Sequence, residues 1–178
     1  YPPYLTDEST ISEIQKNIFG GGGGYSDNEF KGGFGQNALL CRYQSEKRIL
    51  TNPDQLTIEW AGAYKHYHSA MMRTIPIGKA DPKHYKMYEA CLKALIECEK
   101  KLVSGNSVGE VFNAHAKTLD NLGYNNSRMN ACGYSLGATF SPNWMDVPPM
   151  IFANNPLVLK PGMVFFMQIG RASCRERV

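Results

Sequence analysis

The chain has 178 residues, of which 43% are hydrophobic and 20% charged, and its formal net charge is +3 at pH 7. This composition is typical of one soluble globular domain, and no apolar run reaches the roughly 20 residues that a membrane span needs. The basic residues are too few and too scattered to predict a nucleic-acid surface. We therefore expect neither a nucleic-acid nor a membrane partner.

The last ten residues, "IGRASCRERV", are polar and rich in arginine. They match the translation of a common sequencing adapter, so we expect 169–178 to be an artefactual tail and 1–168 to be the domain. Without the tail's three arginines and one glutamate the formal charge is +1.

The start of the chain does not read as a signal peptide. The remaining cysteines have no C-x-x-C spacing, which is typical of reduced thiols in a cytoplasmic protein: Cys41, Cys91, Cys98 and Cys132.

The first half of the chain predicts one helix and three strands. An amphipathic helix covers 9–19, and a tract with five consecutive glycines follows from Gly20. Such a tract is a flexible connection or a backbone that passes close to another group. "ALLCRY" (38–43), "QLTIEWAGAY" (55–64) and "HYHSAMMRTIPIG" (66–78) are predicted strands.

The second half predicts two helices and then strands again. The first helix has Asp81 as its N-cap and ends by Gly105, and its apolar face should bury Cys91 and Cys98. The second begins at a capping box of Ser107 and Glu110. "RMNACGYSLGATF" and "LVLKPGMVFFMQ" return to strand. "FSPNWMDVPP", with Trp144, is a predicted rigid loop, and with Trp60 it should form cleft wall and subunit contact. This order predicts an α+β fold.

Four stretches in this order carry a family resemblance: residues 59–74, the helix pair, "CGYSLG" and "LKPGMVFF". Together they resemble the catalytic domain shared by aminopeptidase P, prolidase, methionine aminopeptidase and creatinase. The resemblance covers roughly residues 13–167 and implies the pita-bread fold, here truncated at both ends. It also implies a homodimer and an N-terminal domain ahead of Tyr1.

The metal-ligand positions of that family are altered in this chain. The metallopeptidase members have a strand Asp, a second Asp eleven residues later, and then x-x-R-T; here these positions hold Glu59, Ala70, Arg73 and Thr74. The other ligand positions fall on Tyr134, near Ser141, at Arg42 beside Cys41, and beside Gln168. The chain therefore resembles the creatinase and ectoine hydrolase branch, which splits carbon–nitrogen bonds without metal, and we expect no metal and no cofactor.

Candidate catalytic residues follow from the resemblance and from strand alternation. His66, His68 and Ala70 should share one face, with His68 as general base and His66 beside the substrate. The alternatives are a structural histidine with satisfied hydrogen bonds, and a zinc site made of the two histidines and Glu59. A buried Glu59 would grip a cationic substrate group. Arg73 would pair with Glu59 or touch the substrate.

The opposite wall is predicted from the strand that holds "CGYSLG". Tyr134 would donate a hydrogen bond to a carboxylate or an oxyanion, with Asn130 and Cys132 at alternate positions. Core packing of Tyr134 is the alternative. Cys41 would be a nucleophile only if a base lowered its pKa.

Three functions remain open at this point. The first is a metal-free hydrolase that cleaves a C–N bond of a small zwitterionic compound. The second is a metal-dependent Xaa-Pro aminopeptidase or dipeptidase. The third is a non-catalytic paralogue that binds a ligand or partner.

Overall fold

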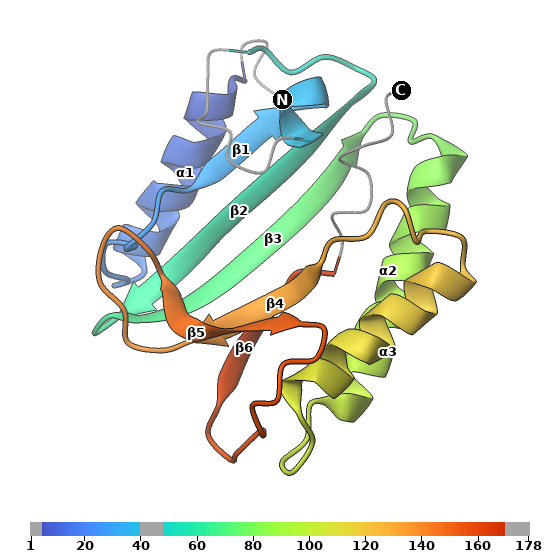
Figure 1. The fold of residues 1–178 in the computed structure, drawn as a ribbon. Helices are drawn as coiled ribbons and strands as arrows, with labels where there is room; N and C mark the ends of the chain where they lie inside the picture. The colour runs from blue at the N-terminus through green and yellow to red at the C-terminus, as the bar shows by residue number, and fades with distance from the viewer. Residues whose placement is uncertain (1–4, 40–47, 170–178) are drawn as a thin grey trace. The chain divides into compact units, whose positions relative to one another are not determined.

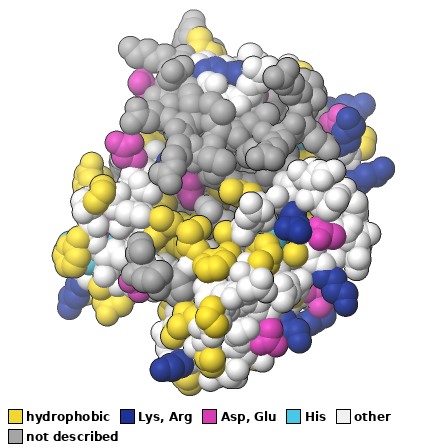
Figure 2. All heavy atoms as spheres, viewed as in Figure 1, with side chains coloured by type: hydrophobic (Ala, Val, Ile, Leu, Met, Phe, Trp, Pro, Cys, Tyr) yellow, Lys and Arg dark blue, Asp and Glu magenta, His cyan; other side chains and the backbone are white. Residues whose placement is uncertain are grey.

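The computed structural model describes residues 5–39 and 48–169, which divide into two compact units (Figure 1). The first unit comprises residues 1–80 and 137–144, and the second comprises 81–136 and 145–178. No helix among the described residues is both long and apolar enough to cross a membrane. On the face drawn in Figure 2, lysine and arginine side chains are scattered among acidic ones and do not form one patch.

The first unit is a helix on a three-stranded antiparallel sheet. Its elements are α1 (Asp7–Gly20), β1 (Lys31–Phe34), the 3-10 helix η1 (Gly35–Leu39), β2 (Asp54–Tyr64) and β3 (Tyr67–Ile77), and the strand order is β1-β2-β3. The predicted helix and the two long strands are confirmed. The predicted strand 38–43 is wrong at its start, which belongs to η1, and its remainder lies outside the described residues.

The glycine tract ends α1 and then brings the backbone against β2. Gly22 has a φ of +84°, and the amide of Gly23 donates to the Ile18 carbonyl over 2.9 Å. A Cβ at Gly23 would lie 2.7 Å from Ile18 Cγ2, so any larger residue there would force Ile18 to move. The amide of Gly24 then donates to the Ala63 carbonyl. The close approach predicted for this tract is confirmed.

The sheet of the first unit has two unlike faces, because side chains alternate along each strand. One face packs under α1 through Phe34, Leu56 and Ile58. The other face, called the site face below, carries the residues at alternate positions of β2 and their partners on β3: Glu59, Ala61, Ala63, His68, Ala70 and Met72.

The second unit is a helix pair on another antiparallel sheet. Its elements are α2 (Pro82–Lys101), α3 (Val108–Asn121), β4 (Ala131–Leu136), β5 (Met145–Phe152) and β6 (Val164–Met167), with strand order β5-β4-β6. Both predicted helices and both N-caps are confirmed. Its core is buried between the helices and the sheet: Ala90, Ala94, Cys98, Val108, Val111, Phe112, Leu119, Cys132, Ile151, Leu159 and Ile169.

One prediction about the second unit is corrected by the structure. Residues 145–149 of the expected loop belong to β5, and their two prolines are tolerated because β5 is an edge strand of the sheet. Ile169, the first residue of the expected tail, is buried in the helix-facing core, and the artefactual origin of the tail stays a prediction. The remaining tail residues lie outside the described part of the chain.

Candidate functional site

His66 lies in the tight turn of the β2–β3 hairpin and not on a strand. Lys65 and His66 have φ values of 49° and 65°, as a two-residue type I′ turn requires. The predicted face shared by His66 and His68 is therefore wrong, because β3 begins at Tyr67. The His66 side chain is 52% exposed, and its ring lies 4.2 Å from the ring of Phe140, centroid to centroid.

His68 is fully buried, and both of its ring nitrogens have partners. Nε2 accepts the backbone N–H of Asp27 at 3.1 Å, and Nδ1 lies 3.2 Å from Thr139 Oγ1. In the neutral form this pattern places the proton on Nδ1, which then donates to Thr139. The geometry favours the structural alternative for His68, since neither nitrogen is left for a substrate. Its catalytic role stays a prediction.

Asp27 holds both histidines, although nothing in its sequence neighbourhood pointed to this role. Its Oδ2 lies 3.4 Å from His66 Nδ1 and 3.3 Å from His68 Nε2. Its Oδ1 accepts the backbone N–H of Ser141 at 3.0 Å. Asp27 thus ties the hairpin end to the segment 139–141: its backbone N–H donates to His68 Nε2, and its carboxylate accepts the N–H of Ser141.

The zinc alternative is not supported. No group of three or more His, Cys, Asp or Glu side chains in the described part of the chain is arranged to hold a metal ion. The carboxylate beside the histidines belongs to Asp27, and Glu59 lies elsewhere on the sheet.

Glu59 is buried on the site face, some distance from His68. The residue opposite His68 on β2 is Ala63, four positions along the strand from Glu59. At 3.3 Å per residue, the two backbone positions are about 13 Å apart. The structure therefore does not bring Glu59 and His68 together as a pair that could act on adjacent atoms of one small molecule.

Lys31, and not Arg73, is the cation across from Glu59. Lys31 on β1 is directly opposite Glu59 in the antiparallel register, so both side chains project from the site face. Arg73 pairs with Ile58 and projects from the other face, where its exposed guanidinium donates to the Met72 carbonyl at 2.7 Å. The predicted pairing of Arg73 with Glu59 is wrong.

Two alanines occupy the middle of the site face along β2 and β3. Ala70 on β3 lies directly opposite Ala61 on β2, between Glu59 and the His68 end of the hairpin. Two methyl groups thus occupy the place where the family resemblance implies a second carboxylate.

The residues predicted for the opposite wall have separate environments in the second unit. Tyr134 is buried on β4 and packs edge-on against Phe166, with ring centroids 5.4 Å apart. Cys132 belongs to the helix-facing core, where a hydrogen bond with Cys98 and burial raise the pKa of its thiol. Asn130 is exposed just before β4. The burial of Cys132 favours core packing, so its predicted role in a cleft wall stays a prediction, and Cys41 lies outside the described residues.

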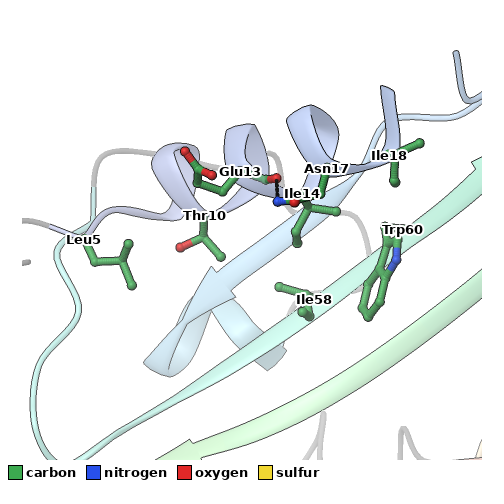
Figure 3. Close-up of a pocket in the computed structure, with 8 residues that line it drawn as sticks. All are labelled: Leu5, Thr10, Glu13, Ile14, Asn17, Ile18, Ile58 and Trp60. Atoms are coloured by element: carbon green, nitrogen blue, oxygen red, sulfur yellow. Dashed lines mark hydrogen bonds between the residues drawn. The ribbon is translucent and has the colours of Figure 1, made fainter. Parts of the chain in front are cut away.

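An apolar groove of about 490 Å³ lies between α1 and the sheet of the first unit (Figure 3). Trp60, which was predicted as cleft wall, lines this groove on the face opposite Glu59. In Figure 3 the Asn17 amide, which donates to the Glu13 carbonyl, lies along its helical side. None of the candidate catalytic residues lines it: the lining consists of Leu5, Thr10, Glu13, Ile14, Asn17, Ile18, Ile58 and Trp60.

Comparison with known sequences identifies relatives of this chain. The profile of the family described as metallopeptidase family M24 matches residues 6–173. An ectoine hydrolase from Halomonas elongata is 27% identical over 63% of this chain and 28% of its own length. A Xaa-Pro dipeptidase from Pyrococcus furiosus is 28% identical over 76% of this chain and 37% of its own length. The chain therefore spans about a third of these relatives.

Comparison with solved structures gives the fold. An X-Pro aminopeptidase from Thermotoga maritima superposes with a TM-score of 0.82 at 15% identity, over 93% of this chain and 46% of that structure. A dipeptidase from Pyrococcus horikoshii gives 0.81 at 22% identity, over 91% and 44%. The pita-bread fold predicted from the sequence is confirmed, and the chain spans less than half of either structure.

Proposed function

The chain belongs to metallopeptidase family M24, and we propose that within this hydrolase family it acts on a C–N bond of a small zwitterionic compound without a metal cofactor. The relatives include an ectoine hydrolase and Xaa-Pro dipeptidases, so both kinds of hydrolysis occur among similar proteins. The choice between them depends on which side chains occupy the site face.

The observation that carries the proposal is the pair of alanines on the site face. Two divalent ions held close together need several carboxylates to offset their mutual repulsion. Along β2 and β3 this face offers Glu59, then Ala61 opposite Ala70, and these two strands add no further carboxylate between Glu59 and His68. The residues present do not fit a dinuclear metal site, and we derive no step through a metal.

Glu59 is the proposed binding residue for the cationic end of the substrate. A buried carboxylate attracts an ammonium or amidinium group and accepts charge-assisted hydrogen bonds from it. Lys31 across the strand offsets part of the carboxylate charge when no substrate is bound. The role predicted for Tyr134, which belongs to the second unit, stays a prediction. His68 acts as an anchor of the hairpin in this proposal, since both of its nitrogens are bonded.

The test uses the full-length protein with ectoine and, separately, a dipeptide that ends in proline. We expect ectoine hydrolysis to survive incubation with EDTA, and elemental analysis to find no stoichiometric metal. Glu59→Gln should abolish ectoine binding, whereas Glu13→Gln, which changes an exposed carboxylate on α1, should leave it unchanged.

Two results would overturn this function. Activity that is lost with chelator and restored by manganese or zinc would show a metal-dependent peptidase. Thermal stabilisation by ectoine without any product would show a ligand-binding paralogue.

A further inference from the structure

The sheet of the first unit places one cation, Lys31, beside Glu59 on the site face. The two residues are directly opposite each other in the register of β1 and β2. Side chains in this position project from the same face, with Cβ atoms about 4.5–5.5 Å apart. Strands β1, β2 and β3 are described along their whole length, and Lys31 is the one lysine or arginine that they contribute to the site face, since Arg73 projects from the other.

The ammonium group of Lys31 has no ion pair within the described part of the chain. The residue is half-buried, and no carboxylate oxygen of a described residue lies within 4.0 Å of its Nζ. Lys31 and Glu59 therefore face the same side of the sheet without closing on each other. One small molecule that carries both charges can contact both side chains.

The 3-10 helix η1 limits the size of a ligand at this place. Gly33, two residues along β1, faces the same side of the sheet as Lys31 because side chains alternate along a strand. A Cβ at Gly33 would lie 2.8 Å from the backbone carbonyl of Asn37 in η1. The backbone of η1 thus lies against the site face next to Lys31, which favours a small compound there over an extended chain.

A zwitterion needs a counter-charge for each of its ends in a site that is partly shielded from water. If Glu59 holds the cationic end, the carboxylate of the same molecule enters the site, and leaving it unpaired would oppose binding. A lysine ammonium group donates charge-assisted hydrogen bonds to a carboxylate. The flexible stem of Lys31 lets the ammonium group move to meet that carboxylate.

We propose that Lys31 binds the carboxylate end of the substrate and is a specificity-determining residue of this site. The assignment rests on the proposed function, because it takes the substrate to be a small zwitterion whose cationic end is bound by Glu59. Together, β1 and β2 select compounds in which a carboxylate lies only a few bonds from a cation. A compound that lacks the carboxylate charge is bound more weakly.

The experiment measures binding of ectoine and of its carboxamide to the full-length protein by titration calorimetry. The carboxamide keeps the cationic ring and lacks the negative charge. Wild type should bind ectoine more tightly than the carboxamide. Lys31→Met should raise the dissociation constant of ectoine about 10- to 100-fold, as expected for the loss of one charge-assisted hydrogen bond, and leave that of the carboxamide within about twofold.

Two control variants accompany this measurement. Lys31→Arg keeps the positive charge and should bind ectoine more tightly than Lys31→Met does. Lys16→Met removes an exposed lysine from α1 and should leave both dissociation constants unchanged. Circular dichroism checks that all variants fold.

Steady-state hydrolysis separates binding from chemistry. In Lys31→Met the KM for ectoine should rise while kcat stays near the wild-type value, because the lost contact is made equally in the ground state and the transition state.

Three outcomes would overturn the role of Lys31 alone. The first is a wild-type protein that binds ectoine and the carboxamide equally well. The second is an equal loss of both ligands in Lys31→Met, which would show a structural effect. The third is unchanged binding in that variant, which would leave Lys31 as a charge that keeps other strands from the sheet edge. A wild-type protein that binds neither ligand would instead refute the proposed function, and this assignment with it.

Discussion

His115 on α3 gives the most direct test of how the stability of the second unit depends on pH. The residue is 1% exposed, and its Nδ1 has no hydrogen-bond partner among the described residues. The pKa of His115 is lowered to about 4, mainly by burial and also by the nearby Arg128 guanidinium, whereas Asp120 acts in the opposite direction. The folded protein therefore holds His115 neutral at pH 7, while the unfolded chain takes up a proton near pH 6.5.

Whether acid stabilises or destabilises the fold depends on which state, folded or unfolded, binds more protons. Between pH 6.5 and pH 4 the unfolded state binds more protons than the folded state, so acidification favours unfolding. A shift from 6.5 to about 4 lowers the free energy of unfolding by about 2 kcal/mol at pH 5, and by about 3 kcal/mol once the pH falls below 4. Above pH 6.5 the full stability is present.

The perturbation is His115→Met, which replaces the imidazole by an apolar side chain of similar volume. Urea unfolding at pH 7.5, 6.5 and 5.0 should show wild type losing about 2 kcal/mol more than this variant between the highest and the lowest pH. His84→Gln, which removes a histidine from the first turn of α2, should behave like wild type. If wild type and His115→Met lost the same stability on acidification, the assignment of this acid sensitivity to His115 would be refuted.

Three further substitutions test the fold by denaturant unfolding at pH 7.5. Ser107→Ala removes the N-cap of α3 and should cost about 1 kcal/mol, and no loss would mean that the capping box is not formed in solution. Thr139→Val leaves the buried Nδ1 of His68 without a partner and should cost about 1–3 kcal/mol, whereas an unchanged midpoint would contradict the anchor role of His68. Ile151→Ala removes a fully buried side chain from β5 and should cost about 2–5 kcal/mol; a smaller loss would place β5 outside the core.

The helices of this chain could be predicted because their ends are encoded locally. Asp81 accepts the amide of Lys83, and Ser107 and Glu110 bond each other's backbone, as their spacing in the sequence indicates. Strand β5 could not be predicted, because its two prolines oppose strand propensity and only its position at the sheet edge makes them tolerable. That position depends on pairing with β4, which local sequence does not reveal.

Only one feature of the candidate site could be predicted from the sequence: which residues of a single strand share a face. The alternation of His68 and Ala70 on β3 follows from strand geometry and is confirmed. The partners of His68 are Asp27 and Thr139, which are 41 and 71 residues away in the sequence. Lys31 likewise lies opposite Glu59 only through the register between β1 and β2. Such contacts are made by tertiary structure, and a single sequence carries no signal for them.

The prolines of β5 also determine how the sheet of the second unit can meet other chains. A strand adds to a sheet edge by hydrogen bonds to its unpaired backbone N–H groups, and proline has none. Pro148 and Pro149 interrupt that row of donors along the β5 edge, whereas β6 at the opposite edge has no proline between Val164 and Met167. The β5 side is thus protected against edge-to-edge aggregation, and any further strand that joins this sheet is expected at β6.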